Sequence, residues 1–234
     1  DEWKLFANYS ESFGSLQYFQ LGQGGSGNDT AAGLEPEKAK TYELGTRYDN
    51  GSWGGEITLF YIDFDDELQY VSNDVGWTNL GATKHQGIET SGHYDFAALD
   101  PRLDGLSVYG SLTYTRATYE GDIPSFKGRD LPLYSRQVAT AGVRYEVDRW
   151  TYNLDAFAQS MQRAPGLSTD SQGNFTHNYI TEPSADGQYG DIPGYVTWNA
   201  RVGYDFGPQA SNLKLGLGVK NLFDKQYFTR SEEH

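Results

Sequence analysis

Residues 195–206, YVTWNARVGYDF, alternate between apolar and polar side chains at almost every step. Even-numbered positions carry valine, tryptophan, alanine, valine and tyrosine, and odd-numbered positions carry threonine, asparagine, arginine, glycine and aspartate. A period of two places successive side chains on opposite faces of an extended strand, whereas a helix repeats every 3.6 residues. Residues 213–220, LKLGLGVK, repeat the pattern after a short Gly-Pro-Gln turn at 207–209. The two stretches predict neighbouring strands of a sheet with one apolar and one polar face.

The same alternation recurs along the whole chain and divides it into about nine strands. We expect these strands at residues 3–13, 39–48, 56–70, 85–96, 106–119, 137–147, 150–162, 195–206 and 213–228. They are roughly 10–15 residues long, whereas strands of soluble proteins are most often about 5–6 residues. A tilted strand that crosses a membrane needs about 9–11 residues. The sequence therefore predicts an all-β fold, an antiparallel up-and-down transmembrane β-barrel, present here as a partial barrel of about nine strands.

The lengths of the connections support the barrel independently. Connections at one end are tight, at 49–52, 99–105, 148–149 and 207–211. Those at the other end run to about 12–29 residues, and this asymmetry is typical of outer-membrane barrels. Aromatic residues cluster near strand ends, as expected of the two interfacial girdles of such a barrel.

Composition excludes several other classes of protein. Aromatic residues make up 15% of the chain and glycines number 28, which suits strands and turns better than helical bundles. No apolar run approaches the roughly 18 residues of a transmembrane helix. The chain has no cysteine, so it has no disulfide framework and no thiolate metal site. A net charge of −14 argues against a nucleic-acid partner.

Several motifs resemble the TonB-dependent siderophore receptor family. Leu34-Glu35-Pro36-Glu37 followed by Tyr42-Glu43-Leu44-Gly45 is similar to the L-x-P-E and Y-E-L-G of that family, and Gly87-Ile88-Glu89 resembles its G-[IVL]-E. The strongest match is Asn221-Leu222-Phe223-Asp224 with Tyr227-Phe228, which resembles the N-L-F-D-x-x-Y-F of the penultimate strand. Within the family, segments such as 185–187, 192–194 and 204–209 resemble the ferric citrate receptors.

The resemblance implies that residues 1–234 are the C-terminal part of a 22-stranded barrel, with the plug, the early strands and the last strand absent. It implies uptake of a ferric chelate, ferric citrate first, across the outer membrane of a Gram-negative bacterium. TonB would supply energy through the plug, and lipid and lipopolysaccharide would surround the barrel. Neither an enzyme activity nor a cofactor is expected, since the chelate is cargo. An open sheet with two unpaired edges is not expected to fold stably alone.

Candidate ligand-binding residues follow from the same resemblance. It implies that the loops at 14–37 and 71–83 fold over the ligand, whose anionic or polar groups call for cationic and amide donors. Ser72 stands where the ferric citrate receptor uses a glutamine, a departure that leaves the identity of the chelate open. The predicted ligand-binding residues are Gln17, Gln20, Ser72, Asn73, Trp77 and Lys84.

Other candidate motifs favour ordinary structural roles. Gly22–Gly27 satisfies G-x-G-x-x-G, but no helix follows, so a surface loop is expected instead of a dinucleotide site. Asp65-Asp66-Glu67 could bind a divalent cation at lipid phosphates, although a solvated loop edge is the simpler expectation. Arg163 and Arg201 are expected to form ion pairs with carboxylates of the barrel or plug. The four histidines, His85, His93, His177 and His234, lack metal-ligand spacing.

Three alternatives stay open at this point. A hydroxamate or mixed siderophore could replace citrate as the ligand. A secreted soluble β-sandwich that binds carbohydrate would also use exposed tyrosine and tryptophan, but strand length and the sorted loops count against it. An outer-membrane enzyme would need a catalytic constellation that the spacing of residues does not reveal.

Overall fold

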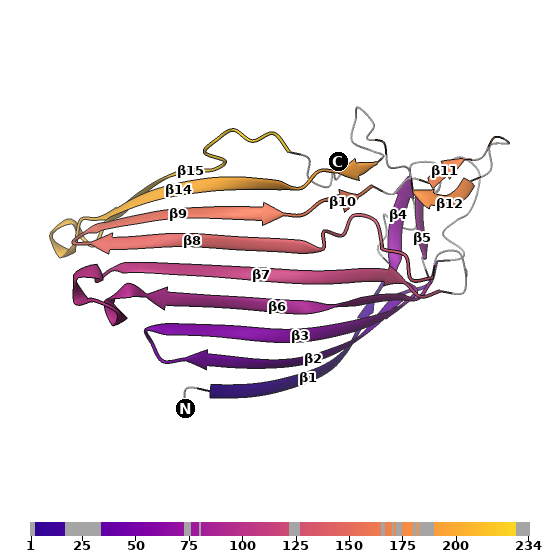
Figure 1. Cartoon of the computed structure of the whole chain (residues 1–234), viewed down its shortest axis with the longest axis horizontal. Coiled ribbons are helices and arrows are strands. Elements are labelled where there is room, and N and C mark those ends of the chain that lie inside the picture. Colours follow the sequence, from indigo (N-terminus) through magenta and orange to yellow (C-terminus); the bar gives the residue numbers. More distant parts are fainter. Residues whose placement is uncertain are drawn as a thin grey trace.

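The computed structural model describes residues 3–16, 34–72, 76–79, 81–121, 127–164, 167–169, 171, 175–179, 182 and 190–227. Nine strands form one continuous, curved sheet in the order β1-β2-β3-β6-β7-β8-β9-β14-β15 (Figure 1). Their bounds are β1 Trp3–Gly14, β2 Glu37–Asp49, β3 Trp53–Asp65, β6 Thr83–Asp95, β7 Leu106–Tyr119, β8 Gln137–Val147, β9 Trp150–Gln159, β14 Tyr195–Asp205 and β15 Lys214–Val219. Every neighbouring pair is antiparallel, and the sheet is not closed. The predicted all-β partial barrel of about nine strands is confirmed.

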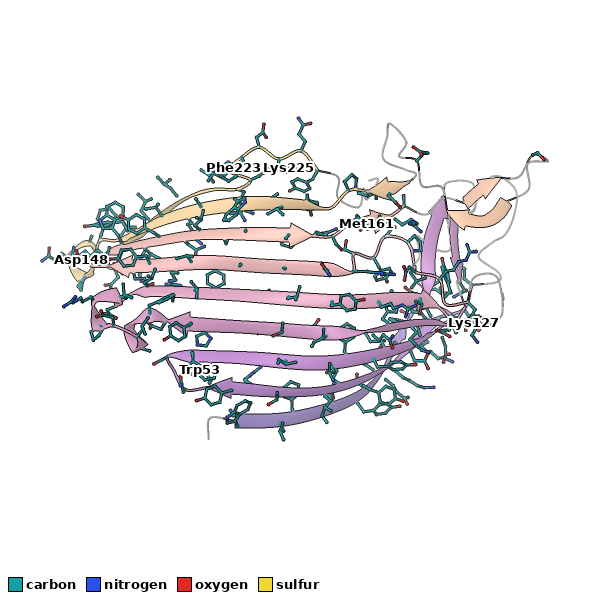
Figure 2. The ribbon with its side chains drawn as sticks, viewed as in Figure 1. Trp53, Lys127, Asp148, Met161, Phe223 and Lys225 are labelled. Atoms are coloured by element: carbon teal, nitrogen blue, oxygen red, sulfur yellow. The ribbon has the colours of Figure 1, made fainter. Side chains whose placement is uncertain are left out.

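Short connections gather at one end of the sheet and the remaining strands at the other (Figure 1). At the tight-turn end, Asn50 accepts the backbone N–H groups of Ser52 and Trp53, and Gly51 has a φ of 88°. Three 3-10 helices lie in other turns at this end: η2 Phe96–Ala98, η3 Pro101–Leu103 and η4 Pro208–Ala210. The loop end carries three two-stranded sheets, which pair β4 Leu68–Ser72 with β5 Gly76–Asn79, β10 Gln162–Arg163 with β13 Asp191–Ile192, and β11 Leu167–Thr169 with β12 Phe175–Tyr179. In Figure 2, Asp148 lies at the tight-turn end and Lys127 at the loop end.

The large sheet has one apolar and one polar face, as the alternation predicts. Strand register aligns Leu44 with Leu59 and Leu59 with Ile88, so the apolar positions of successive strands form continuous rows. Leu44 is 59% exposed and Leu217 is 72% exposed. Among the described residues, only six apolar side chains are buried: Ala39, Ala117, Leu131, Pro132, Ala164 and Ile192. The chain therefore leaves its apolar face uncovered, which a soluble monomer rarely does over so large an area.

Aromatic rings pack over glycines on the polar face. Phe6 lies directly opposite Gly45, and Phe60 lies directly opposite Gly87. A Cβ atom added at Gly87 would come within 2.7 Å of Phe60 Cζ. Glycine is therefore required there, because any larger residue would displace the ring or the neighbouring strand. Tyr109 covers Gly142 in the same way.

Three predicted strand ends are wrong. The predicted strand 150–162 ends at Gln159, and residues 162–163 form the separate strand β10. The predicted strand 56–70 is divided, because Asp66 adopts a left-handed φ of 58° between β3 and β4. The predicted strand 213–228 ends at Val219, because Asn221 and Asp224 have φ values of 52° and 49°. The Asn221 side chain accepts the Lys225 N–H at 2.9 Å and donates to the Lys225 carbonyl at 2.9 Å, which turns the chain. The N-L-F-D motif is thus a turn that follows the strand.

Strands β1 and β15 form the two edges of the sheet, in agreement with the expected unpaired edges. No helix in the described part of the chain is long and apolar enough to cross a membrane.

Candidate functional site

Glu67 is the centre of a buried polar cluster at the loop end. It follows β3, and the left-handed Asp66 turns it inward, so that Glu67 is only 8% exposed. Thr83 donates a hydrogen bond to Oε2, Tyr134 donates to Oε1 at 3.0 Å, and His85 Nε2 lies 3.2 Å from Oε2. Both carboxylate oxygens therefore have donors, as a buried charge requires. The expectation of a solvated edge is wrong for Glu67.

Aromatic rings enclose the cluster. The His85 ring packs edge-on against Phe64, with centroids 5.0 Å apart, and against Tyr134, at 4.9 Å. Thr83 is fully buried and His85 is 5% exposed. Burial by itself raises the pKa of the Glu67 carboxyl, but hydrogen bonds from His85, Thr83 and Tyr134 outweigh burial and hold the pKa below its ordinary value. The cluster is thus built around an ionised carboxylate.

The cluster stands at the base of the β4–β5 hairpin. The backbone N–H of Glu67 donates to the carbonyl of Gly81 at 3.3 Å, and the N–H of Leu68 donates to Glu37 Oε2 at 3.2 Å. Asn79, the last residue of β5, accepts the N–H of Glu35 at 2.8 Å and donates to the Glu35 carbonyl at 2.9 Å. The L-x-P-E motif therefore fastens one end of the β4–β5 hairpin to the rim of the sheet. The sequence offered no sign of this contact beyond the motif itself.

An ion pair also stabilises the loop end of the sheet. Arg163 Nε donates to Asp191 Oδ1 at 2.9 Å and joins β10 to β13. The Leu133 N–H donates to the Arg163 carbonyl at 2.7 Å, so the β7–β8 connection is attached to the same pair. The predicted ion pair of Arg163 with a barrel carboxylate is confirmed. Arg201 makes no ion pair within the described residues, so the prediction for Arg201 is unsupported.

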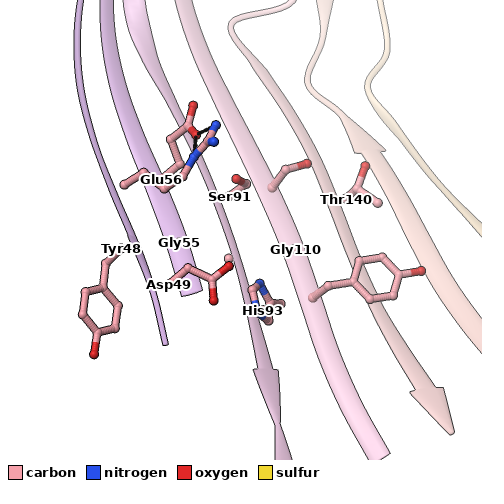
Figure 3. Close-up of a pocket in the computed structure, with 12 residues that line it drawn as sticks. Tyr48, Asp49, Gly55, Glu56, Ser91, His93, Gly110 and Thr140 are labelled. Carbon is pink, nitrogen blue, oxygen red and sulfur yellow. Dashed lines mark hydrogen bonds and ion pairs between the residues drawn. The ribbon is translucent and has the colours of Figure 1, made fainter. Parts of the chain in front are cut away.

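The polar face is hollowed near the tight turns, where a pocket of about 560 Å³ lies (Figure 3). Arg47 and Glu56 form an ion pair along one wall. Asp49 and His93 lie side by side, because Gly54 between them has no side chain; a Cβ there would be 2.8 Å from His93 Cε1 and 3.1 Å from Asp49 Cγ. No group of three or more metal-ligating side chains gathers within the described ranges. The pocket is therefore lined mainly by polar side chains, including those of Arg47, Asp49, Glu56 and His93.

A chain of hydrogen bonds crosses the rest of the polar face. Tyr109 donates to Asn153 Oδ1 at 3.1 Å, and Asn153 donates to Asp155 Oδ1 at 3.0 Å. Asn199 donates to Asp155 Oδ2 at 2.7 Å and accepts the N–H of Asn221 at 3.0 Å. These hydrogen bonds link β7 to the turn after β15, and they satisfy polar side chains on the polar face of the sheet.

The predicted ligand-binding residues fall in different places. Ser72 ends β4 and pairs with Gly76, and Trp77 lies in β5 opposite Tyr70, so the hairpin brings the backbones at 72 and 77 together. Gln17, Gln20 and Asn73 lie outside the described residues.

Lys84 stands on the apolar face, on the opposite side of β6 from Thr83 and His85. It lies 5.6 Å from the centroid of the Tyr61 ring and 3.6 Å from Glu120 Oε1. This position adds no support to its predicted ligand role. Sequence reasoning missed Glu67, Thr83, Tyr134 and Asn79 as the residues that support the hairpin.

Comparison with known proteins gives concordant results. The family described as TonB dependent receptor-like, beta-barrel matches residues 1–222. The structure of the ferric citrate transporter FecA in the unliganded form has a TM-score of 0.77 and 40% sequence identity, over 99% of this chain and 32% of that chain. The structure of the copper transporter OprC has a TM-score of 0.71 and 18% sequence identity, over 97% of this chain and 32% of that chain. At this identity, the similarity shows the fold alone.

A curated relative extends the comparison. The metal-pseudopaline receptor CntO of Pseudomonas aeruginosa (strain UCBPP-PA14) is 26% identical over an alignment of 234 positions, which covers 97% of this chain and 28% of the receptor. This chain therefore spans about a third of the length of the proteins that it matches.

Proposed function

This chain belongs to the TonB-dependent receptor β-barrel family, and from that premise we propose that the full-length protein takes up a ferric chelate, ferric citrate, with energy supplied by TonB. The fold and the relatives are those of transport receptors and not of enzymes, and they place the chain in the outer membrane of a Gram-negative bacterium.

One observation carries the choice of ferric citrate. Identity to the ferric citrate transporter is 40% across 99% of the chain, whereas identity to the metal-pseudopaline receptor is 26% and to the copper transporter 18%.

A second candidate is a receptor for a different metal chelate or siderophore. Ser72 differs from the glutamine expected of a ferric citrate receptor, and a curated relative with 26% identity takes a metal complex of pseudopaline. The two candidates share the fold and differ in the residues that meet the ligand. Binding selectivity therefore separates them.

The β4–β5 hairpin is the element of the described chain best placed to meet the ligand. Its base is fixed on three sides by Glu67, Glu37 and Asn79, while its tip carries Ser72 and Trp77. A rigid base reduces the entropy lost when a hairpin closes on a ligand. We therefore keep Ser72, Asn73 and Trp77, with Gln17 and Gln20, as predicted contacts, and Lys84 as the least supported one.

The test is calorimetry on the full-length receptor in detergent, with ferric citrate and ferrichrome as ligands. We expect saturable binding of ferric citrate that weakens about tenfold or more in Trp77→Ala, since a buried aromatic contact contributes at least that much. Gln86→Ala, on the apolar face of β6, is the control variant and is expected to bind as the wild type does. Binding of ferrichrome alone would contradict the citrate proposal, and binding of neither ligand would contradict uptake of a ferric chelate of these classes.

A further inference from the structure

The side chain of Asn79 binds three backbone groups from two other parts of the chain. Its Oδ1 accepts the N–H of Glu35 at 2.8 Å, and its Nδ2 donates to the carbonyls of Glu35 at 2.9 Å and of Asp66 at 2.7 Å. A contact with both the N–H and the carbonyl of one residue resembles the pairing that a neighbouring strand supplies. Asn79 therefore fixes the direction of the chain at Glu35 as well as its position.

Glu37 makes a second contact between the segment before β2 and the hairpin. Its Oε2 accepts the N–H of Leu68 at 3.2 Å, and Leu68 is the direct partner of Asn79 in the β4–β5 hairpin. The Glu37 side chain also lies across Gly14, its partner in the last residue pair of β1 and β2, where an added Cβ would come within 2.7 Å of Glu37 Cγ. The last residue pair of β1 and β2 is thus joined directly to the first residue pair of the hairpin.

The side chains of Asn79 and Glu37 together are called the clamp. Its contacts do more than satisfy polar groups of the backbone. Glu35 is exposed, so its N–H and carbonyl groups could bind water in place of Asn79. What water could not supply is a fixed position for residues 34–37 against the hairpin.

The hairpin depends on such contacts because its strands do not continue those of the large sheet. Asp66 and Gly81 flank it with left-handed φ values of 58° and 74°, and β4 and β5 form a separate two-stranded sheet. In Figure 1 these two strands run across the direction of the nine-stranded sheet. The orientation of the hairpin is therefore set by contacts at its base, and the clamp supplies those with the chain that enters β2.

We propose that Asn79 and Glu37 are positioning residues that make residues 34–37, the end of the predicted ligand-binding loop at 14–37, and the β4–β5 hairpin one structural unit toward a ligand. Order that a ligand imposes on one segment is then shared by the other, and the entropy of ordering is lost once instead of twice. This inference rests on the proposed uptake function where it concerns the ligand. The joining of the two segments follows from the contacts alone.

Hydrogen exchange of the full-length receptor in detergent, without ligand, tests whether the clamp transmits a change between the segments. Glu67→Gln weakens the base of the hairpin, and the partners of Glu67 in the described part of the chain lie outside 34–37. We expect Glu67→Gln to raise exchange in residues 34–40 about fivefold when the clamp is present. In the background Asn79→Ala/Glu37→Ala we expect a rise of less than about twofold, because coupled sites are not additive.

Two further variants complete the exchange experiment. Asn8→Ala is the matched control background, because Asn8 donates a hydrogen bond to Glu43 within the β1–β2 pair and belongs to neither segment. Glu67→Gln is expected to keep its full effect there. Asn79→Ala alone keeps the Glu37 contact and is expected to give an intermediate effect. An effect of Glu67→Gln that is equal with and without the clamp would overturn the proposal.

Calorimetry with ferric citrate tests the part of the inference that concerns the ligand. We expect Asn79→Ala/Glu37→Ala to bind about tenfold more weakly than the wild type, because the ligand must then order the two segments separately. Asn8→Ala is expected to bind within about twofold of the wild type. Equal binding by the clamp variant and the wild type would overturn the positioning role. A wild-type receptor that binds no ferric citrate would contradict the proposed function instead, and hydrogen exchange would still decide whether the clamp joins the two segments.

Discussion

Glu67 and His85 meet beneath the base of the β4–β5 hairpin, with Glu67 Oε2 3.2 Å from His85 Nε2 and both residues less than a tenth exposed. Thr83 and Tyr134 complete the contacts of the carboxylate. The pair joins the end of β3, the start of β6 and the β7–β8 connection. The β4–β5 hairpin is therefore anchored to three parts of the sheet at once.

Replacing Glu67 with glutamine tests that anchor. We expect Glu67→Gln to lower the free energy of unfolding by about 1–3 kcal/mol, because an amide cannot accept all the hydrogen bonds that the two carboxylate oxygens receive. The urea midpoint of the full-length receptor, followed by tryptophan fluorescence, measures the change. Glu89→Gln is the matched control, since Glu89 is exposed and lies on the face of β6 that also carries Thr83 and His85. Equal losses in the two variants would show that Glu67 has no special role.

Acidification should remove the same contribution. Folding lowers the pKa of the Glu67 carboxyl below its ordinary value of 4.5. A group of this kind stabilises the fold above its unfolded pKa, and that stabilisation is lost as the pH falls through the folded pKa. The difference in unfolding free energy between wild type and Glu67→Gln is therefore expected to be present at neutral pH and to shrink progressively below 4.5. Urea titrations at a series of pH values measure it, and a difference that grows on acidification would contradict the assigned contacts.

The aromatic-over-glycine pairs predict a sharp contrast between two glycines. Gly87→Ala places a methyl group 2.7 Å from Phe60 Cζ and against the carbonyl of Tyr114, so we expect a loss of about 1–3 kcal/mol from overpacking. Gly203→Ala is the control, because the nearest atom to its added methyl lies 3.8 Å away. Refolding yield and urea midpoint of the full-length receptor measure both. Similar behaviour of the two variants would contradict the close packing of Phe60.

The turn after β15 predicts an ordered series of substitutions. Asn221→Gly keeps a residue that tolerates the φ of 52° but loses both hydrogen bonds to Lys225. Asn221→Ala loses the same bonds and also strains the backbone, which costs roughly a further 1 kcal/mol. We therefore expect unfolding midpoints in the order wild type, then glycine, then alanine. An alanine variant as stable as the glycine variant would contradict the left-handed conformation.

Sequence periodicity predicts strands well in this protein and turns poorly. The bounds of β7 and β8 agree with the prediction to the residue, because nothing interrupts the alternation of their two faces. The ends of β3 and β15 were wrong because aspartate and asparagine take a left-handed φ at 66 and 221, and alternation carries no sign of that choice. Side chains alternate between the two faces of a strand, and even-numbered residues of β6, such as Ile88, lie on the apolar face. The position of Lys84 on that face could therefore have been inferred from the sequence.

The buried cluster could not be predicted for a different reason. Glu67 receives its hydrogen bonds from Thr83, 16 residues away, and from Tyr134, 67 residues away. In the sequence it is the third member of an acidic run, and such runs are usually solvated. Its burial depends on the fold of two loops around it, which local patterns do not encode. Local patterns do not encode the ligand contacts either, since these contacts depend on how the loops converge.

Uptake of iron-55 citrate is the most direct test of the central claim. The full-length receptor would be expressed in Gram-negative cells that lack their own ferric citrate receptor, with and without TonB. We predict saturable uptake that requires both the receptor and TonB and that excess unlabelled ferric citrate suppresses more strongly than ferrichrome does. Uptake equal to that of cells without the receptor, or uptake that persists without TonB, would contradict the assignment of this chain to a ferric citrate receptor.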